Sequence, residues 1–172
     1  MNPRAHASAA GFSLFELVMV IVLLTIVAAV AAPFASNGFK AYYTGRDLAE
    51  TDWQARVALE RMTRDLRSVR APADITMTSG ADLSIIDVDG TTIRYCLGTI
   101  GTCPGASGEL MRNTQPLATG VSGLVFSYLT RANPPVTTAV PANVYYIVVD
   151  FTATQGSNSR PYQATVSPRT FP

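Results

Sequence analysis

Residues 11–35 read GFSLFELVMVIVLLTIVAAVAAPFA, a run in which Glu16 is the one charged residue. A carboxylate at the centre of a membrane-spanning helix costs roughly 2.5–3.5 kcal/mol on the translocon-insertion scale. A residue with that cost needs a functional reason. As a helix, residues 17–35 would reach about 28 Å, close to the roughly 30 Å hydrocarbon core of a bilayer. The sequence therefore predicts one membrane-spanning helix with an acid near its start.

The rest of the 172-residue chain divides by composition. Charged residues concentrate in 40–70, and the segment that follows is rich in Thr, Ser, Gly, Pro, Val and Tyr. With 13 Lys+Arg against 12 Asp+Glu, the chain has no cationic excess for general polyanion binding. We expect a hydrophobic transmembrane or assembly helix over 12–37, an amphipathic helix over 38–71, and a β-rich globular domain over 73–172.

Residues 1–11 differ from an ordinary secretory signal. The apolar run follows the plausible cleavage junction, Gly11-Phe12, whereas a conventional signal places it before the junction. Cleavage there would remove the positive end of the chain and leave the apolar helix on the product. By the positive-inside rule, Arg4 and the α-amino group place the N-terminus in the cytoplasm and the C-terminal domain outside.

Together these features resemble the N-terminus of type IV prepilins and type II secretion pseudopilins. The shared elements are a short leader ending in Gly11, then Phe12, Glu16 four positions on, a long apolar helix, and Pro33 within it. The resemblance implies that an inner-membrane prepilin peptidase cuts after Gly11 and N-methylates Phe12. It also implies that Glu16 recruits and aligns subunits during assembly.

The implied role of Glu16 agrees with electrostatics. In a bundle of such helices, the carboxylate can meet the new α-ammonium group on Phe12 of a neighbouring subunit. Attraction between two desolvated ions is strong, although its net value against desolvation varies. An unpaired Glu16 would penalise a misaligned neighbour, and so the pair would fix the register. The alternative is a glutamate that reaches the lipid headgroups and has no further role.

Pro33 is expected to kink or loosen the helix, because it lacks a backbone donor and its ring clashes with the preceding turn. Gly38 and Gly45 lower the helix propensity further along. A stretchable or partly melted segment near 30–45 is therefore consistent with the sequence of a filament subunit. A simple bend at the membrane exit is the alternative, and the two are compatible.

Residues 46–70 are typical of an amphipathic helix. An apolar stripe with 3-4-3 spacing predicts the face that packs on a sheet. Its members are Leu59, Met62, Leu66 and Val69, extended by Trp53, Ala55 and Ala58.

The charged residues are spaced for i,i+4 pairs. These are Asp52–Arg56, Arg56–Glu60, Glu60–Arg64 and Arg61–Asp65. Acids interrupt the arginines, which share no single face, so an ion-paired surface is favoured over nucleic-acid binding. Ala71-Pro72 should end the helix.

From residue 73 onward, short β-type runs alternate with turn signals, and the expected fold is α+β. In this fold the long helix packs on one antiparallel sheet of about four to six strands, as in type IV pilins. Asp89-Gly90 lies between two β-rich runs and predicts a hairpin. Residues 147–149 are apolar on both strand faces, which indicates a central strand.

Few residues suggest metal or catalytic chemistry. Asp87 and Asp89 are weak calcium candidates, because the further ligands of a calcium loop do not follow. Cys96 and Cys103 are expected to form a disulfide in an oxidising compartment, with free thiols or a metal site as the alternatives. Loss of the leader would remove His6, the one histidine, and with it any Ser-His-Asp or Cys-His arrangement. An Asp87/Asp89 dyad is the remaining catalytic candidate. We expect no enzyme and no cofactor.

Residues 58–67, ALERMTRDLR, the cysteine pair beside a hairpin and the final SPRTFP are similar to minor pilins and pseudopilins of the MshO, PilW and GspJ groups. This resemblance implies a minor subunit of an MSHA-like type IV pilus, acting at filament initiation or the tip. The implied partners are other pilin subunits, the prepilin peptidase and the inner-membrane assembly platform. The implied location is the bacterial inner membrane and then the periplasm or a surface pilus.

Two alternatives remain at this point. One is a J-type minor pseudopilin of a type II secretion system. The other is a membrane-tethered periplasmic module for adhesion or DNA binding, which does not polymerise. A cleavable Gly11 followed by Glu16 favours a filament subunit, because a simple tether does not need either feature.

Overall fold

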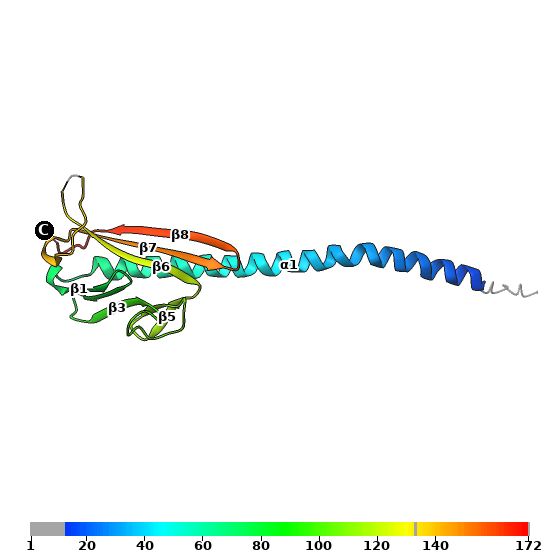
Figure 1. Cartoon of the computed structure of the whole chain (residues 1–172), viewed down its shortest axis with the longest axis horizontal. Coiled ribbons are helices and arrows are strands. Elements are labelled where there is room, and N and C mark those ends of the chain that lie inside the picture. The colour runs from blue at the N-terminus through cyan, green and yellow to red at the C-terminus, as the bar shows by residue number, and fades with distance from the viewer. Residues whose placement is uncertain (1–12, 133, 172) are drawn as a thin grey trace, which may run out of the picture. The chain divides into compact units, whose positions relative to one another are not determined.

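The computed structural model describes residues 13–132 and 134–171 (Figure 1). The chain forms two units, Met1–Gly45 and Arg46–Pro172. The helices and strands, in chain order, are α1 Leu14–Arg67, β1 Ile75–Ser79, β2 Asp82–Ile86, β3 Thr92–Leu97, β4 Leu110–Arg112, β5 Gln115–Ala118, β6 Val121–Leu129, β7 Tyr146–Gln155 and β8 Asn158–Val166. Short 3₁₀ turns occupy Pro72–Asp74 and Pro141–Asn143.

In the described part of the first unit, Ser13 precedes the N-terminal part of α1. All side chains from residue 13 to 47 are exposed to solvent in the single chain. Pro33 lies inside the helix, which continues through residues 30–45. The expected loosening of the helix near these residues would occur in an assembled filament, so it stays a prediction.

The second unit contains two antiparallel sheets, so the prediction of an α+β fold is confirmed. One sheet has five strands in the order β1-β2-β3-β4-β5, and the other has three in the order β6-β7-β8. The expectation of a single sheet of four to six strands is therefore wrong. The change of sheet occurs between β5 and β6, where β6 pairs with β7 and not with β5.

Gly120 lies at this change of sheet. Its φ is +67°, and a Cβ on it would lie 2.5 Å from the carbonyl oxygen of Thr154. The Thr154 N–H donates to the Gly120 carbonyl at 2.7 Å. Because only glycine accepts both the positive φ and this close approach at low cost, Gly120 allows β6 to leave the first sheet and begin the second.

Two local predictions for the strands are confirmed. β2 and β3 form an antiparallel hairpin around Asp89 and Gly90, with Ile86 opposite Thr92. β7 is the central strand of its sheet, and residues 147–149 are all buried.

The core joins the helix to both sheets. Ala55, Ala58, Met62 and Leu66 of α1 are fully buried in one cluster with residues from strands of the two sheets. Burial of a Met or Leu side chain stabilises the fold by about 1.5–3 kcal/mol. The predicted helical stripe therefore forms the helix side of the core, with Leu59 partly buried against it.

Three details of the predicted helix are wrong. Trp53 is 67% exposed and does not extend the stripe. The helix ends at Arg67 and not at residue 70 or 71. Val69 is fully buried, but it lies beyond the helix and forms a bridge with Asp87. The helix ends early because the backbone N–H of Arg70 donates to the Ile86 carbonyl of β2.

Candidate functional site

The N-terminal part of α1 exposes apolar side chains that a water-soluble protein would normally bury. From Leu14 to Phe34, the large hydrophobic side chains are 47–83% exposed. Among the described residues, α1 is the one helix long and apolar enough to cross a membrane, and none of its apolar window is covered by the rest of the chain. Such a surface needs lipid or other proteins to cover it. It supports the predicted membrane anchor.

Glu16 lies in the first turn of this helix. The Ser13 hydroxyl accepts a hydrogen bond from the Glu16 N–H at 3.2 Å, and the Ser13 carbonyl accepts one from the Leu17 N–H at 3.2 Å. Ser13 therefore caps α1, and Ser13-x-x-Glu16 has the spacing of a capping box. The carboxylate also lies at the positive end of the helix dipole.

The other residues predicted at this end of the chain have different outcomes. Gly11 and Phe12, the predicted cleavage and methylation sites, lie outside the described residues. Pro33 is at an exposed position within α1. For the Glu16 carboxylate, the structure records no hydrogen-bond or ion-pair partner within residues 13–132 and 134–171. Its predicted counter-ion would come from another subunit.

At the globular end of α1, Asp65 forms a buried polar cluster. Its carboxylate accepts hydrogen bonds from the Tyr95 hydroxyl at 2.7 Å and from the Arg112 Nε at 2.8 Å. Arg61 Nε approaches the second oxygen at 3.5 Å, as its i,i+4 spacing predicted. Burial, followed by the neighbouring Asp65 carboxylate, raises the pKa of Tyr95. This cluster fixes the helix to β3 and β4 of the five-stranded sheet.

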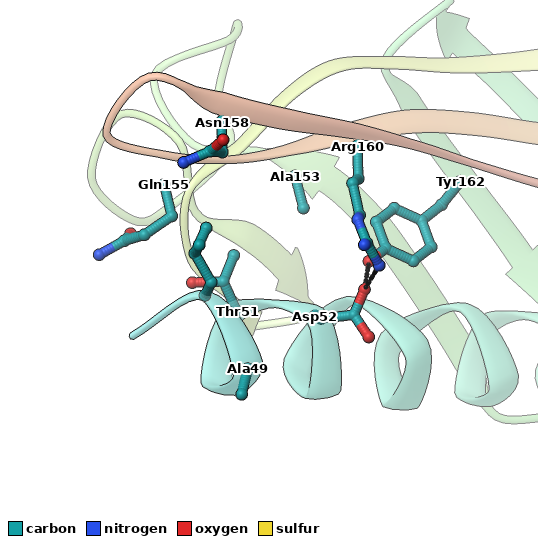
Figure 2. A pocket seen from close by; sticks show the side chains of 9 residues that line it. Ala49, Thr51, Asp52, Ala153, Gln155, Asn158, Arg160 and Tyr162 are labelled. Atoms are coloured by element: carbon teal, nitrogen blue, oxygen red, sulfur yellow. Dashed lines mark hydrogen bonds and ion pairs between the residues drawn. The ribbon is translucent and has the colours of Figure 1, made fainter. Parts of the chain in front are cut away.

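Asp52 connects the helix to the other sheet. Figure 2 shows its carboxylate in contact with Arg160 and Tyr162 of β8. The three side chains line a cleft of about 270 Å³. Arg160 Nη1 lies 3.1 Å from Asp52 Oδ1, and the Tyr162 hydroxyl donates to the same oxygen. Arg56, the predicted i,i+4 partner, donates from Nε at 2.7 Å. Chiefly through the Tyr162 hydrogen bond, and then through that of Arg56, the pKa of Asp52 falls from 3.8 to about 2.

The shifted pKa of Asp52 predicts an acid-dependent part of the stability. Because the folded pKa lies below the unfolded one, the stabilisation is fully present above about pH 4 and disappears as the pH falls towards 2. We expect Asp52→Asn to unfold less steeply with acidification over this window than the unsubstituted chain. Urea unfolding midpoints at pH 6, 4, 3 and 2 measure the difference. Glu60→Gln, which removes a charge from an exposed pair, should keep the original steepness. Parallel curves for Asp52→Asn and the original chain would contradict the assignment.

The predicted disulfide between Cys96 and Cys103 is present, with 5.8 Å between the Cα atoms. Cys96 lies at the end of β3, and Cys103 is in the loop before β4. Arg94 supports the same loop, because its guanidinium binds both Asp82 oxygens at 2.9 and 2.6 Å and donates to Thr102 at 3.0 Å.

Removal of this disulfide has a predictable effect on stability. In the chain-entropy model, a bond that closes so short a loop contributes about 2–3 kcal/mol. We expect the double substitution Cys96→Ala with Cys103→Ala to lower the free energy of unfolding by about that amount. Urea unfolding with and without reductant checks this: reductant should destabilise the original chain and leave the double variant unchanged. An original chain that is insensitive to reductant would contradict it.

The calcium candidates form a turn in this structure. Asp87 Oδ1 accepts hydrogen bonds from the N–H groups of Asp89 at 3.0 Å and Thr91 at 2.8 Å. Asp87 therefore stabilises the β2–β3 hairpin through its own backbone neighbours. Within residues 13–132 and 134–171, no group of three or more His, Cys, Asp or Glu residues could hold a metal ion.

Three of the four predicted i,i+4 pairs of the helix are present, and the fourth, Arg56–Glu60, is not among the ion pairs of the described residues. Arg56 binds Asp52, Arg64 binds Glu60 at 3.0 Å, and Arg61 approaches Asp65. In these three pairs an acid of the helix accompanies each arginine. Sequence reasoning missed the long-range partners of the two aspartates, Tyr95, Arg112, Arg160 and Tyr162, because no local spacing connects them.

Comparison with known proteins identified no family model, curated protein or solved structure that matches the chain.

Proposed function

We propose that the chain is a minor pilin or pseudopilin subunit that assembles into a filament through the N-terminal part of α1. The observation that carries this proposal is the exposed apolar N-terminal part of α1, with one acid in its first turn. A globular domain attached to the same helix by a buried core would then form the outer part of a filament subunit.

The proposed assembly step depends on charge. A prepilin peptidase would cut after Gly11 and methylate the new N-terminus at Phe12, which leaves a cation one helical turn before Glu16. Within a helix bundle, the Glu16 carboxylate of one subunit would bind the terminal ammonium group of the next. The apolar side chains would then exchange lipid contacts for contacts with neighbouring helices.

Within this class, the motifs of the second helical region favour a minor subunit of an MSHA-like type IV pilus, at filament initiation or the tip. Its partners would be other pilin subunits, the prepilin peptidase and the inner-membrane assembly platform. A J-type pseudopilin of a type II secretion system is the second candidate. The ion-paired helix surface argues against the DNA-binding form of a tethered module.

The intact mass of the protein purified from membranes tests the proposal. We expect a chain that begins at Phe12, carries one added methyl group, and is two hydrogens lighter than the dithiol form. The Cys96→Ala, Cys103→Ala variant is the control: it should show the same leader loss and methylation, and its mass should not change on reduction. Material that begins at Met1 in cells that otherwise assemble filaments would contradict the proposal.

A further inference from the structure

An aromatic segment follows the apolar run of α1, and filament assembly through Glu16 does not explain it. Phe39, Tyr42 and Tyr43 are 58–68% exposed. The two tyrosine rings meet edge to face with centroids 5.8 Å apart. Lys40 lies among them, and the polar pair Ser36-Asn37 precedes them. Tyrosine rings, which have a polar end, and long cationic side chains are typical of the interface between lipid and water.

We propose that this aromatic segment, residues 39–43, binds the headgroup layer on the C-terminal side of the bilayer and sets the depth of the helix. At that depth, Glu16 of an unassembled subunit lies at the opposite interface and not in hydrocarbon. The inference rests on the proposed function only in requiring that α1 spans a membrane.

The spacing along the helix supports this register. Glu16 and Ser36 are separated by about 30 Å at 1.5 Å per residue, which equals the thickness of the hydrocarbon core. Tyr42 lies about 9 Å beyond Ser36, so Glu16 and Tyr42 are about 39 Å apart, close to the 40–45 Å that includes both headgroup layers. A helix tilt of about 40°, the upper end of the observed range, would be needed to bring both residues to the edges of the core.

This register determines the step at which the charge of Glu16 becomes costly. In the membrane, a carboxylate among headgroups and water keeps its hydration. Desolvation would begin when the helix is drawn out of the bilayer among other subunits. The requirement for a counter-ion would therefore act at the extraction step, and an unassembled subunit would be stable in the membrane.

Depth-dependent fluorescence quenching tests the register. Trp53 is the one tryptophan of the chain and lies exposed on α1, so Trp53→Phe gives a background without tryptophan. In this background, full-length chains carrying Phe15→Trp, Ile26→Trp or Tyr42→Trp are reconstituted singly into phosphatidylethanolamine/phosphatidylglycerol vesicles. Lipids brominated at different acyl positions act as quenchers.

We expect Ile26→Trp to report a position near the bilayer centre, with Phe15→Trp and Tyr42→Trp about 15 Å shallower or more. If Phe15→Trp is quenched at the same depth as Ile26→Trp, the proposed register is wrong. Filament assembly does not enter this measurement, so failure of the register would leave the proposed function standing, and failure to assemble would leave the register standing.

A second variant isolates the aromatic segment. Phe39→Ala, Tyr42→Ala and Tyr43→Ala together, in the Phe15→Trp background, should shift or broaden the depth measured at position 15. The matched control replaces Phe34, an exposed aromatic residue inside the apolar run, and Phe34→Ala should leave that depth unchanged. An unchanged depth in the triple variant would show that hydrophobic length alone sets the register, and would overturn the role given to residues 39–43.

Discussion

Glu16→Ala is expected to abolish incorporation of the chain into filaments while leaving membrane insertion and leader processing intact. The substitution removes the one carboxylate of the apolar run, which in the proposed assembly binds the terminal ammonium group of an adjacent subunit. That ammonium group would then be buried without a partner, a situation that costs about 3–5 kcal/mol when one member of a buried ion pair is removed. Insertion should not suffer, because alanine is more favourable in lipid than glutamate.

A second explanation for Glu16 must be separated from charge pairing. Ser13 and Glu16 have the capping-box spacing, and the Ser13 hydroxyl already accepts a hydrogen bond from the Glu16 N–H. Glutamine is as suitable as glutamate at this position of the box, but it carries no charge. Glu16→Gln therefore keeps the helix cap and removes the ion pair. We expect this variant to fail in assembly as Glu16→Ala does.

Sheared and pelleted filaments, blotted for the subunit and compared with its membrane-bound pool, provide the measurement. Intact mass of the membrane-bound pool shows whether processing has occurred. Assembly of Glu16→Gln at the original level would assign the residue to helix capping. Normal incorporation of Glu16→Ala would contradict both explanations and, with them, the proposed reason for an acid in the apolar run.

Local patterns were sufficient to predict several elements. The helical stripe of Ala58, Met62 and Leu66 was predictable because the 3.6-residue period depends only on backbone geometry. The Asp89-Gly90 hairpin followed from turn chemistry, since Gly90 adopts φ +79°. The central position of β7 followed from its two apolar faces. In each case the physical cause lies within about ten residues of sequence.

Features set by distant contacts were not predictable. The end of α1 at Arg67 depends on a hydrogen bond between Arg70 and Ile86, and helix propensity alone would continue the helix. The division into two sheets depends on the close approach of the Gly120 backbone to the Thr154 backbone. Neither contact leaves a local signal, because strands that pair across many residues are specified by three-dimensional packing.

The candidate site divides in the same way. Glu16 could be identified from sequence, because one charge in an apolar run is conspicuous and costly. For Asp65 the local spacing predicts only a helix-surface pair with Arg61, and this is the longest of its three contacts. Its principal partners, Tyr95 and Arg112, lie 30 and 47 residues away. A buried aspartate in an i,i+4 pair looks the same in sequence as an exposed one.

Asp65→Ala is accordingly expected to cause a large loss of stability in the globular unit. Asp65 is 8% exposed, and its removal leaves the fully buried Tyr95 hydroxyl and the half-buried Arg112 without their acceptor. Loss of one member of such a cluster costs about 3–5 kcal/mol. Urea unfolding of the full chain in detergent micelles, followed by circular dichroism, measures the change. Glu60→Ala is the matched control, because its i,i+4 pair with Arg64 is exposed and contributes about 0.3–0.5 kcal/mol.

Tyr95→Phe shows whether the loss arises from the unsatisfied hydroxyl or only from a smaller side chain. In the original chain, this substitution breaks one hydrogen bond and should destabilise by about 0.5–1.5 kcal/mol. In the Asp65→Ala background it removes a buried donor that has lost its partner, and it should cost little or restore stability. The double-mutant cycle should therefore give a coupling of about 0.5–3 kcal/mol between the two positions. Additive effects would mean that Asp65 and Tyr95 do not act together, and the buried cluster would then not be what holds α1 to the five-stranded sheet.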